Sequence, residues 1–297
     1  MKRLLLGISA TLILCAGVYG GLSWLVVEQS LVAKPKEITG VPSILGMEFE
    51  EVSFSPHDEP HIQLSGWWIP NPNSSRTIVY VHGLDGAKDE RLGFLQALHS
   101  NGYSIFAFDL RGHGESDKVQ MGAGQHEQRD LLGAIHYAAE KQPGNSIALY
   151  GISFGGAIVL LTGSQSSSIQ AIISDSSFAS IPELIAEEVS TRTSMPTWGA
   201  AVLKPGIIWA AKWFKGVDIL SVNPAEKVNE LPFPVALIHC KDSERVPFSH
   251  AERIIANAPA KTSTLWIDGC DHAGGWDYAP QDYLTFILEY LDSRMPR

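Results

Sequence analysis

A serine at the tip of a glycine-rich turn is the residue in this sequence best placed to do chemistry. Residues 151–155 are Gly-Ile-Ser-Phe-Gly, the G-x-S-x-G pattern. The apolar run 147–150 has the length and composition of a buried strand, and 156–162 resembles the start of a helix. A serine between a strand and a helix, flanked by glycines that avoid clashes, is typical of a nucleophile elbow. Ser153 is therefore a candidate nucleophile, with a purely structural glycine-rich turn as the alternative.

A serine hydroxyl is a poor nucleophile unless a base lies within hydrogen-bonding distance. Of the ten histidines, His272 is the best candidate, because it follows the last predicted strand, 262–267, by a few residues. The carboxyl ends of parallel strands open on one edge of a sheet, where ligands bind, and Ser153 follows such a strand too. The alternative for His272 is a solvated loop histidine.

Strands and helices alternate along most of the chain, which predicts an α/β fold whose mostly parallel sheet carries helices on both faces. Strands are predicted at 47–54, 62–69, 77–81, 103–108, 147–150, 169–173, 234–239 and 262–267. Helices are predicted at 91–100, 125–141, 156–162, 248–256 and 278–291.

The segment 176–230 breaks this alternation. It contains several prolines and no clear strand. Its aromatic residues include four within 198–214, some at helical spacing: Trp198, Trp209, Trp213 and Phe214. We interpret it as a helical cap inserted over the active site; ordinary helices packed on the core are the alternative.

The N-terminus carries a long apolar segment. Residues 4–27 contain no charge and are long enough to cross a bilayer, and Lys2 and Arg3 precede them. We expect an uncleaved single-span anchor at 1–27, with a cleaved signal peptide as the alternative, a linker at 28–45 and one catalytic domain at 46–297. The basic pair should stay in the cytoplasm, which would place that domain in the periplasm or outside the cell.

Composition excludes several function classes. The net charge of −10 argues against a nucleic-acid partner. The sequence contains no P-loop, zinc-ligand spacing or dinucleotide fingerprint, so we expect no cofactor and no metal.

Four segments together resemble the α/β-hydrolase superfamily, and most closely its branch of membrane-anchored and serine-aminopeptidase-like serine hydrolases. They are Val81-His82-Gly83, Asp109-Leu110-Arg111-Gly112-His113-Gly114-Glu115-Ser116, the elbow 151–156, and His272. The resemblance covers 47–297. It implies a Ser-acid-His triad, with the oxyanion hole formed by the backbone N–H groups of Leu84 and Phe154.

The acid of the triad is the point where this sequence departs from the family pattern. The relatives' pattern His-Gly-x-x-Asp-x-x-Val-Pro, aligned on 239–247, places the usual acid at Ser243. Asp242 is our choice for the acid; Glu244 and Asp175 remain alternatives.

The resemblance implies a membrane-anchored hydrolase of carboxylic (acyl) esters or thioesters that acts through an acyl-enzyme. A peptidase acting on short peptides is an alternative, in which acidic cap residues would hold a substrate amine: Glu183, Glu187 and Glu188. A catalytically inactive hydrolase fold used for binding is another.

Two of the three cysteines follow strands that are neighbours in this fold. Cys240 comes directly after one strand and Cys270 just after the last, so their Cα atoms could fall within the roughly 4.4–6.8 Å that a disulfide requires. We predict a bridge, which an extracytoplasmic location would preserve; two buried thiols are the alternative.

Overall fold

The computed structural model describes residues 2–295 and divides into two compact units. The helical unit consists of Met1–Val32 and Ile181–Val222. The sheet unit consists of Ala33–Ser180 and Asn223–Arg297.

The sheet unit is built on one eight-stranded sheet in the order β1-β2-β4-β3-β5-β6-β7-β8. The strands are β1 (Glu50–Phe54), β2 (Leu64–Ile69), β3 (Arg76–Val81), β4 (Ser104–Phe108), β5 (Ser146–Ile152), β6 (Ile169–Asp175), β7 (Ala236–Cys240) and β8 (Ser263–Ile267). β2 is antiparallel to both of its neighbours, and all pairs from β4 to β8 are parallel. The predicted mostly parallel sheet is confirmed.

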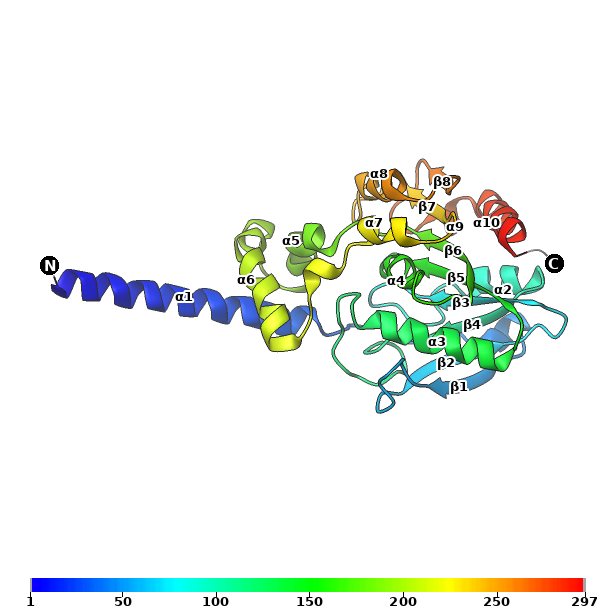
Figure 1. The fold of residues 1–297 in the computed structure, drawn as a ribbon, viewed down its shortest axis with the longest axis horizontal. Helices are drawn as coiled ribbons and strands as arrows, with labels where there is room; N and C mark the ends of the chain where they lie inside the picture. The colour runs from blue at the N-terminus through cyan, green and yellow to red at the C-terminus, as the bar shows by residue number, and fades with distance from the viewer. Residues whose placement is uncertain (1, 296–297) are drawn as a thin grey trace. The chain divides into compact units, whose positions relative to one another are not determined.

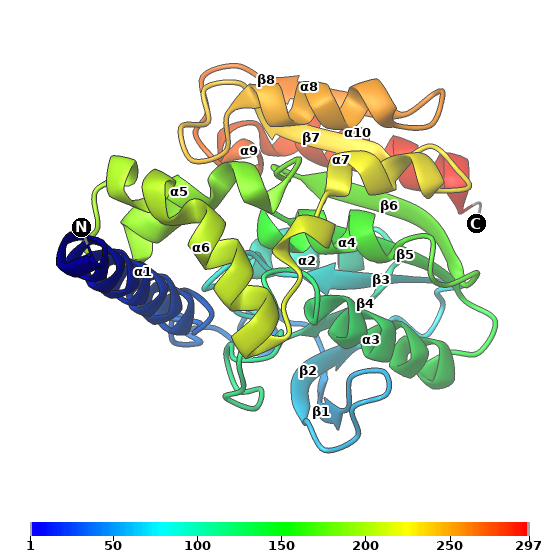
Figure 2. The ribbon, with the colours of Figure 1, turned by 60° about the vertical axis from the view of Figure 1, so that its left-hand side comes forward.

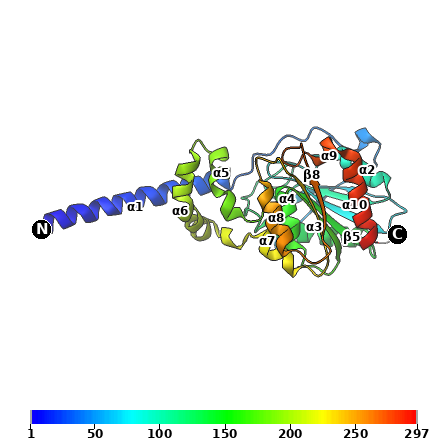
Figure 3. The same cartoon turned by 90° about the horizontal axis from the view of Figure 1, so that it is seen from above.

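Helices cover both faces of this sheet, as predicted (Figure 3). On one side lie α2 (Leu92–Ser100), α9 (Gly275–Tyr278) and α10 (Pro280–Arg294). On the other lie α3 (Glu127–Lys141), α4 (Phe154–Thr162), α7 (Pro224–Lys227) and α8 (Phe248–Asn257). Short 3-10 turns occur at Pro42–Leu45 and Val228–Glu230.

The central strands are buried along their whole length, because helices cover them from both sides. The core on the α2 and α10 side contains fully buried aromatic rings that contact one another: Tyr80, Phe94, Tyr150 and Tyr283. This packing makes the sheet a rigid base for the loops at its carboxyl edge.

The helical unit contains α1 (Lys2–Ser30), α5 (Ile181–Arg192), α6 (Thr197–Lys215) and a 3-10 turn at Ile219–Ser221 (Figure 1). Among the residues that the structure describes, one helical segment is long and apolar enough to cross a membrane, Arg3–Ser30. The segment between β6 and β7 is helical, as expected, and its part in this unit is 181–222, within the predicted 176–230.

Candidate active site

Ser153 occupies the turn between β5 and α4 in a strained backbone conformation. Its φ of 54° and ψ of −112° lie where a residue with a side chain rarely occurs. The serine N–H donates to the Asp175 carbonyl at 2.7 Å. A Cβ on Gly151 would lie 2.2 Å from the Gly155 carbonyl oxygen, and one on Gly155 would lie 2.2 Å from that of Val81. The two flanking glycines are therefore required by close backbone contacts.

The imidazole of His272 lies next to this serine. Ser153 Oγ is 2.7 Å from His272 Nε2. His272 comes from the loop after β8, so two strand ends bring these residues together, as the sequence predicted. This is the geometry of a nucleophile and its base.

Four hydrogen bonds hold the histidine loop in place. Ala273, at φ 59°, donates its N–H to Ser176 Oγ at 3.2 Å. Ser176 Oγ in turn donates to the buried carboxylate of Asp175 at 2.8 Å. The Arg91 guanidinium, at the start of α2, donates to the Ala273 carbonyl and to Asp277. His272 is thus positioned by the end of β6 and by α2.

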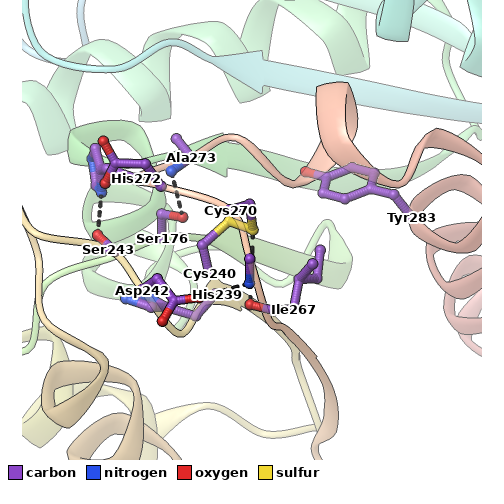
Figure 4. The surroundings of a disulfide bond; sticks show 12 residues. Ser176, His239, Cys240, Asp242, Ser243, Ile267, Cys270, His272, Ala273 and Tyr283 are labelled. Atoms are coloured by element: carbon purple, nitrogen blue, oxygen red, sulfur yellow. Dashed lines mark hydrogen bonds between the residues drawn. A yellow bond between two sulfur atoms is a disulfide. The ribbon is translucent and has the colours of Figure 1, made fainter.

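The second nitrogen of the imidazole contacts a hydroxyl. Ser243 Oγ lies 3.3 Å from His272 Nδ1, and Figure 4 shows the two side chains joined. The Val246 N–H donates to the same oxygen at 3.3 Å, which fixes the hydroxyl. Ser243 is buried. It occupies the position at which the family pattern carries its acid.

None of the carboxylates considered from the sequence contacts this imidazole within residues 2–295. Asp242 Oδ2 accepts a hydrogen bond from the Gly269 N–H at 2.6 Å. Glu244 is exposed, and its backbone N–H donates to Asp271. Asp175 is buried and accepts from the Tyr283 hydroxyl at 2.7 Å. The geometry therefore favours Ser243 over Asp242 as the partner of His272 Nδ1. Residue 243 faces the histidine, as the acid does in the family pattern aligned on 239–247.

The imidazole is neutral at physiological pH. Burial is the main cause that lowers the pKa of His272 to about 4, and the nearby Arg245 and His239 contribute to the same shift. A neutral imidazole can accept the serine proton.

The loop predicted to form the oxyanion hole lies against the nucleophile. A Cβ built on Gly83 would be 3.5 Å from Ser153 Cβ. The Gly83 N–H donates to Glu90 at 2.8 Å, and His82 Nε2 accepts from the Leu110 N–H at 3.0 Å. Phe154 begins α4, where the helix supplies no acceptor for its N–H.

The motif 109–116 supports that loop rather than supplying reactive groups. Asp109 accepts from the Lys88 backbone N–H at 2.7 Å and pairs with its buried ammonium at 3.0 Å. His113 Nε2 accepts from the Asp85 N–H at 3.2 Å. Burial lowers the pKa of His113 to about 3, so this ring is a neutral structural acceptor.

Cys240 and Cys270 form a disulfide, with their Cα atoms 5.3 Å apart (Figure 4). The predicted bridge is thus present. It joins the end of β7 to the loop that carries His272. No group of three or more potential metal-ligating side chains occurs in the part of the chain that the structure describes.

Comparisons with known proteins identify related sequences and a shared fold. A family described as serine aminopeptidase, S33, matches residues 72–207. The uncharacterized protein YqkD of Bacillus subtilis is 24% identical over 256 residues, which cover 85% of this chain and 78% of YqkD.

Solved structures share the fold. The esterase Pf2001 of Pyrococcus furiosus has a TM-score of 0.72 at 21% identity, over 89% of this chain and 98% of the esterase. A bacterial membrane phospholipase A has a TM-score of 0.62 at 16% identity, over 100% of both chains. The chain therefore has the α/β-hydrolase fold of these structures, and its residues 72–207 match the serine aminopeptidase family.

Proposed function

We propose that this protein is a membrane-anchored serine hydrolase that cleaves acyl esters or thioesters. The observation that carries the proposal is the 2.7 Å contact between Ser153 Oγ, in a strained turn, and His272 Nε2. A packing role would not require a serine in so unfavourable a backbone conformation.

The reaction follows from the positions of these groups. Nε2 of the neutral His272 accepts the Ser153 proton as the oxygen attacks the substrate carbonyl carbon. The backbone N–H groups of Phe154 and Leu84 stabilise the oxyanion that forms. The imidazolium then donates its proton to the departing alcohol or thiol, which leaves an acyl-enzyme. Water, deprotonated by His272, releases the acid and restores the serine.

Ser243 takes the place of the triad acid in this proposal. Nδ1–H donates to Ser243 Oγ, which fixes the tautomer that leaves Nε2 free to accept a proton. A neutral hydroxyl orients the ring but does not stabilise the imidazolium as a carboxylate would. Ser243 is thus a positioning residue.

Three observations support an anchored, extracytoplasmic enzyme. α1 is apolar along the length needed to cross a bilayer, and a membrane phospholipase A shares the fold over the whole chain. The Cys240–Cys270 disulfide is of the kind that persists in oxidising compartments.

A fluorophosphonate probe on the purified full chain tests the proposal. The wild type should be labelled, Ser153→Ala should not, and Ser167→Ala, an exposed serine outside the site, should match the wild type. Labelling of Ser153→Ala at the wild-type level would contradict the assignment. A panel of esters, thioesters and short peptides then separates an esterase from a peptidase, and an unlabelled wild type would indicate a binding protein.

A further inference from the structure

α6 is apolar on two opposite faces. One face packs within the helical unit through buried side chains such as Leu203 and Ile207. On the other side lies a stripe of exposed residues: Trp198, Val202, Pro205, Trp209 and Trp213. At about 100° per residue these five positions fall within an arc of roughly 80°. Trp198 and Trp213 are 75% and 71% exposed.

A helix that is apolar all round is normally buried, either in a protein core or in a membrane. The lysines of α6 border the stripe or pair away from it, since Lys212 pairs with Asp218 and Lys215 with Glu28. The acidic residues of α5 lie on another helix: Glu183, Glu187 and Glu188. Exposed tryptophans are characteristic of the boundary between lipid and water. The stripe therefore has the chemistry of a bilayer interface.

Contacts with α1 fix the level of this stripe along the anchor. The Tyr19 hydroxyl donates to the Val202 carbonyl and accepts from the Gly206 N–H, both at 3.1 Å. Gly206 also packs on Ser23, and Lys215 pairs with Glu28 at 2.6 Å. α6 therefore contacts the C-terminal half of α1, and Figure 2 shows the two helices side by side.

The dimensions of a bilayer place that level at its surface. Tyr19 lies roughly 23 Å along the helix from Leu4, at about 1.5 Å per residue. The hydrocarbon core is about 30 Å thick, so it would extend from Leu4 to near Trp24. α6 then crosses α1 at the outer boundary of the hydrocarbon, with the Glu28–Lys215 pair among the headgroups.

We propose that the exposed stripe of α6 inserts into the outer leaflet of the same bilayer that α1 spans. The inference rests on the proposed anchor, and its occupant is lipid. The cap helix would then be an interfacial element of the membrane rather than a freely solvated lid.

The test uses the fact that Cys15, in α1, is the free cysteine. The full chain is reconstituted in phosphatidylcholine vesicles and labelled with a fluorescent maleimide at Cys15. Three further proteins lack this cysteine (Cys15→Ser) and are labelled instead at one introduced cysteine: Trp213→Cys, Val202→Cys or Glu187→Cys. The last is a matched control, exposed but on the acidic helix of the same unit. Quenching is measured with nitroxide-labelled lipid and with aqueous iodide.

We expect the labels at 202 and 213 to be quenched by the lipid probe at least about twofold more than the label at 187, and to be shielded from iodide. Labels at both stripe positions that respond to iodide like the one at 187 would overturn the proposal. The Cys15 label separately reports whether the anchor is inserted, and hydrolysis of a soluble ester separately reports the catalytic assignment.

Discussion

Ser243 offers the imidazole of His272 a neutral hydrogen-bond partner where an acid would offer a charge. In a Ser-His-Asp triad the carboxylate both selects the tautomer and stabilises the imidazolium that forms during the reaction. A hydroxyl 3.3 Å from Nδ1 can do only the first. In the proposed site, Ser153 and His272 therefore have a third member, Ser243, that can be altered in either direction.

Restoring the charge should raise activity. Ser243→Asp should increase kcat by at least about tenfold, because a carboxylate at Nδ1 stabilises the imidazolium in the transition state. The matched control is Ser243→Asn, because an asparagine side chain has nearly the same volume as aspartate but carries no charge. An equal gain in both variants would mean that side-chain size, not charge, limits the wild type.

Removing the hydroxyl should lower activity. Ser243→Ala should reduce kcat roughly 10–100-fold with little change in KM, because the ring loses the partner that fixes its tautomer. Asp242→Asn should cost less, since Asp242 contacts the Gly269 N–H and not the imidazole. A larger loss in Asp242→Asn would return the acid role to Asp242. Both kinetic constants are measured on a soluble ester.

The pH dependence follows from the lowered pKa of His272. The neutral ring is the active form, so kcat/KM should stay constant as pH falls from neutral and drop only as pH passes through about 4. In Ser243→Asp the carboxylate favours the charged ring, so the acid limb should move to higher pH. An acid limb near the ordinary histidine value in the wild type would mean that the pKa of His272 is not lowered as expected. The measurement is a pH profile with a substrate that does not titrate.

At the scale of elements, the disulfide joins the two loops that carry Ser243 and His272. It closes a loop of 30 residues, and its loss should destabilise the sheet unit by about 3–4 kcal/mol. The double variant Cys240→Ala/Cys270→Ala should unfold at lower temperature, measured by thermal denaturation without reductant. Cys15→Ala, which leaves the bridge intact, is the control. Equal melting temperatures would mean that the bridge is not formed in solution.

Packing of α6 on α1 depends on one glycine. A Cβ on Gly206 would lie 2.2 Å from Ser23 Oγ, whereas one on Gly199 of the same helix meets nothing closer than 3.3 Å. In a helix interior alanine is favoured over glycine by about 1 kcal/mol, but a contact of 2.2 Å outweighs this gain at Gly206. Gly206→Ala should therefore destabilise the helical unit, and Gly199→Ala, which displaces only the Met195 side chain, should change its stability little, measured by limited proteolysis of 181–222 in detergent. Similar effects of both substitutions would argue against the α1–α6 contact.

The sheet could be predicted from the sequence because its strands are short apolar runs that alternate with amphipathic helices. The position of Ser153 in a strand–helix turn could be predicted from the spacing of the flanking glycines. The position of His272 beside it could be predicted because this histidine follows the last strand. The hydrogen-bond partner of His272 Nδ1 was not predicted correctly. Alignment with the family pattern pointed to Ser243, but we expected a carboxylate and therefore chose Asp242. Side-chain direction in a tight loop is set by backbone contacts, here Val246 N–H to Ser243 Oγ, that are not visible in residue types.

At the scale of the whole molecule, two kinds of evidence bear on orientation in the membrane, and they differ in strength. Lys2 and Arg3 precede the apolar segment 4–27, but Lys34 and Lys36 follow it closely, so the basic residues on the two sides are balanced. The disulfide of the sheet unit discriminates better, because cytosolic thiols are kept reduced. The bridge therefore favours a sheet unit outside the cytoplasm.

Reporter fusions after Arg297, expressed in a bacterial host, test this orientation. Alkaline phosphatase, which requires an oxidising compartment to become active, should be active in the fusion, and a green fluorescent protein exported in the same way should stay dark. The control lacks α1, starts after Val32 and should give the opposite pattern. In membranes from the same cells, Cys240 and Cys270 should resist alkylation until they are reduced. A full-length fusion that is fluorescent would place the sheet unit in the cytoplasm. Alkylation of Cys240 and Cys270 before reduction would show that the bridge is not formed.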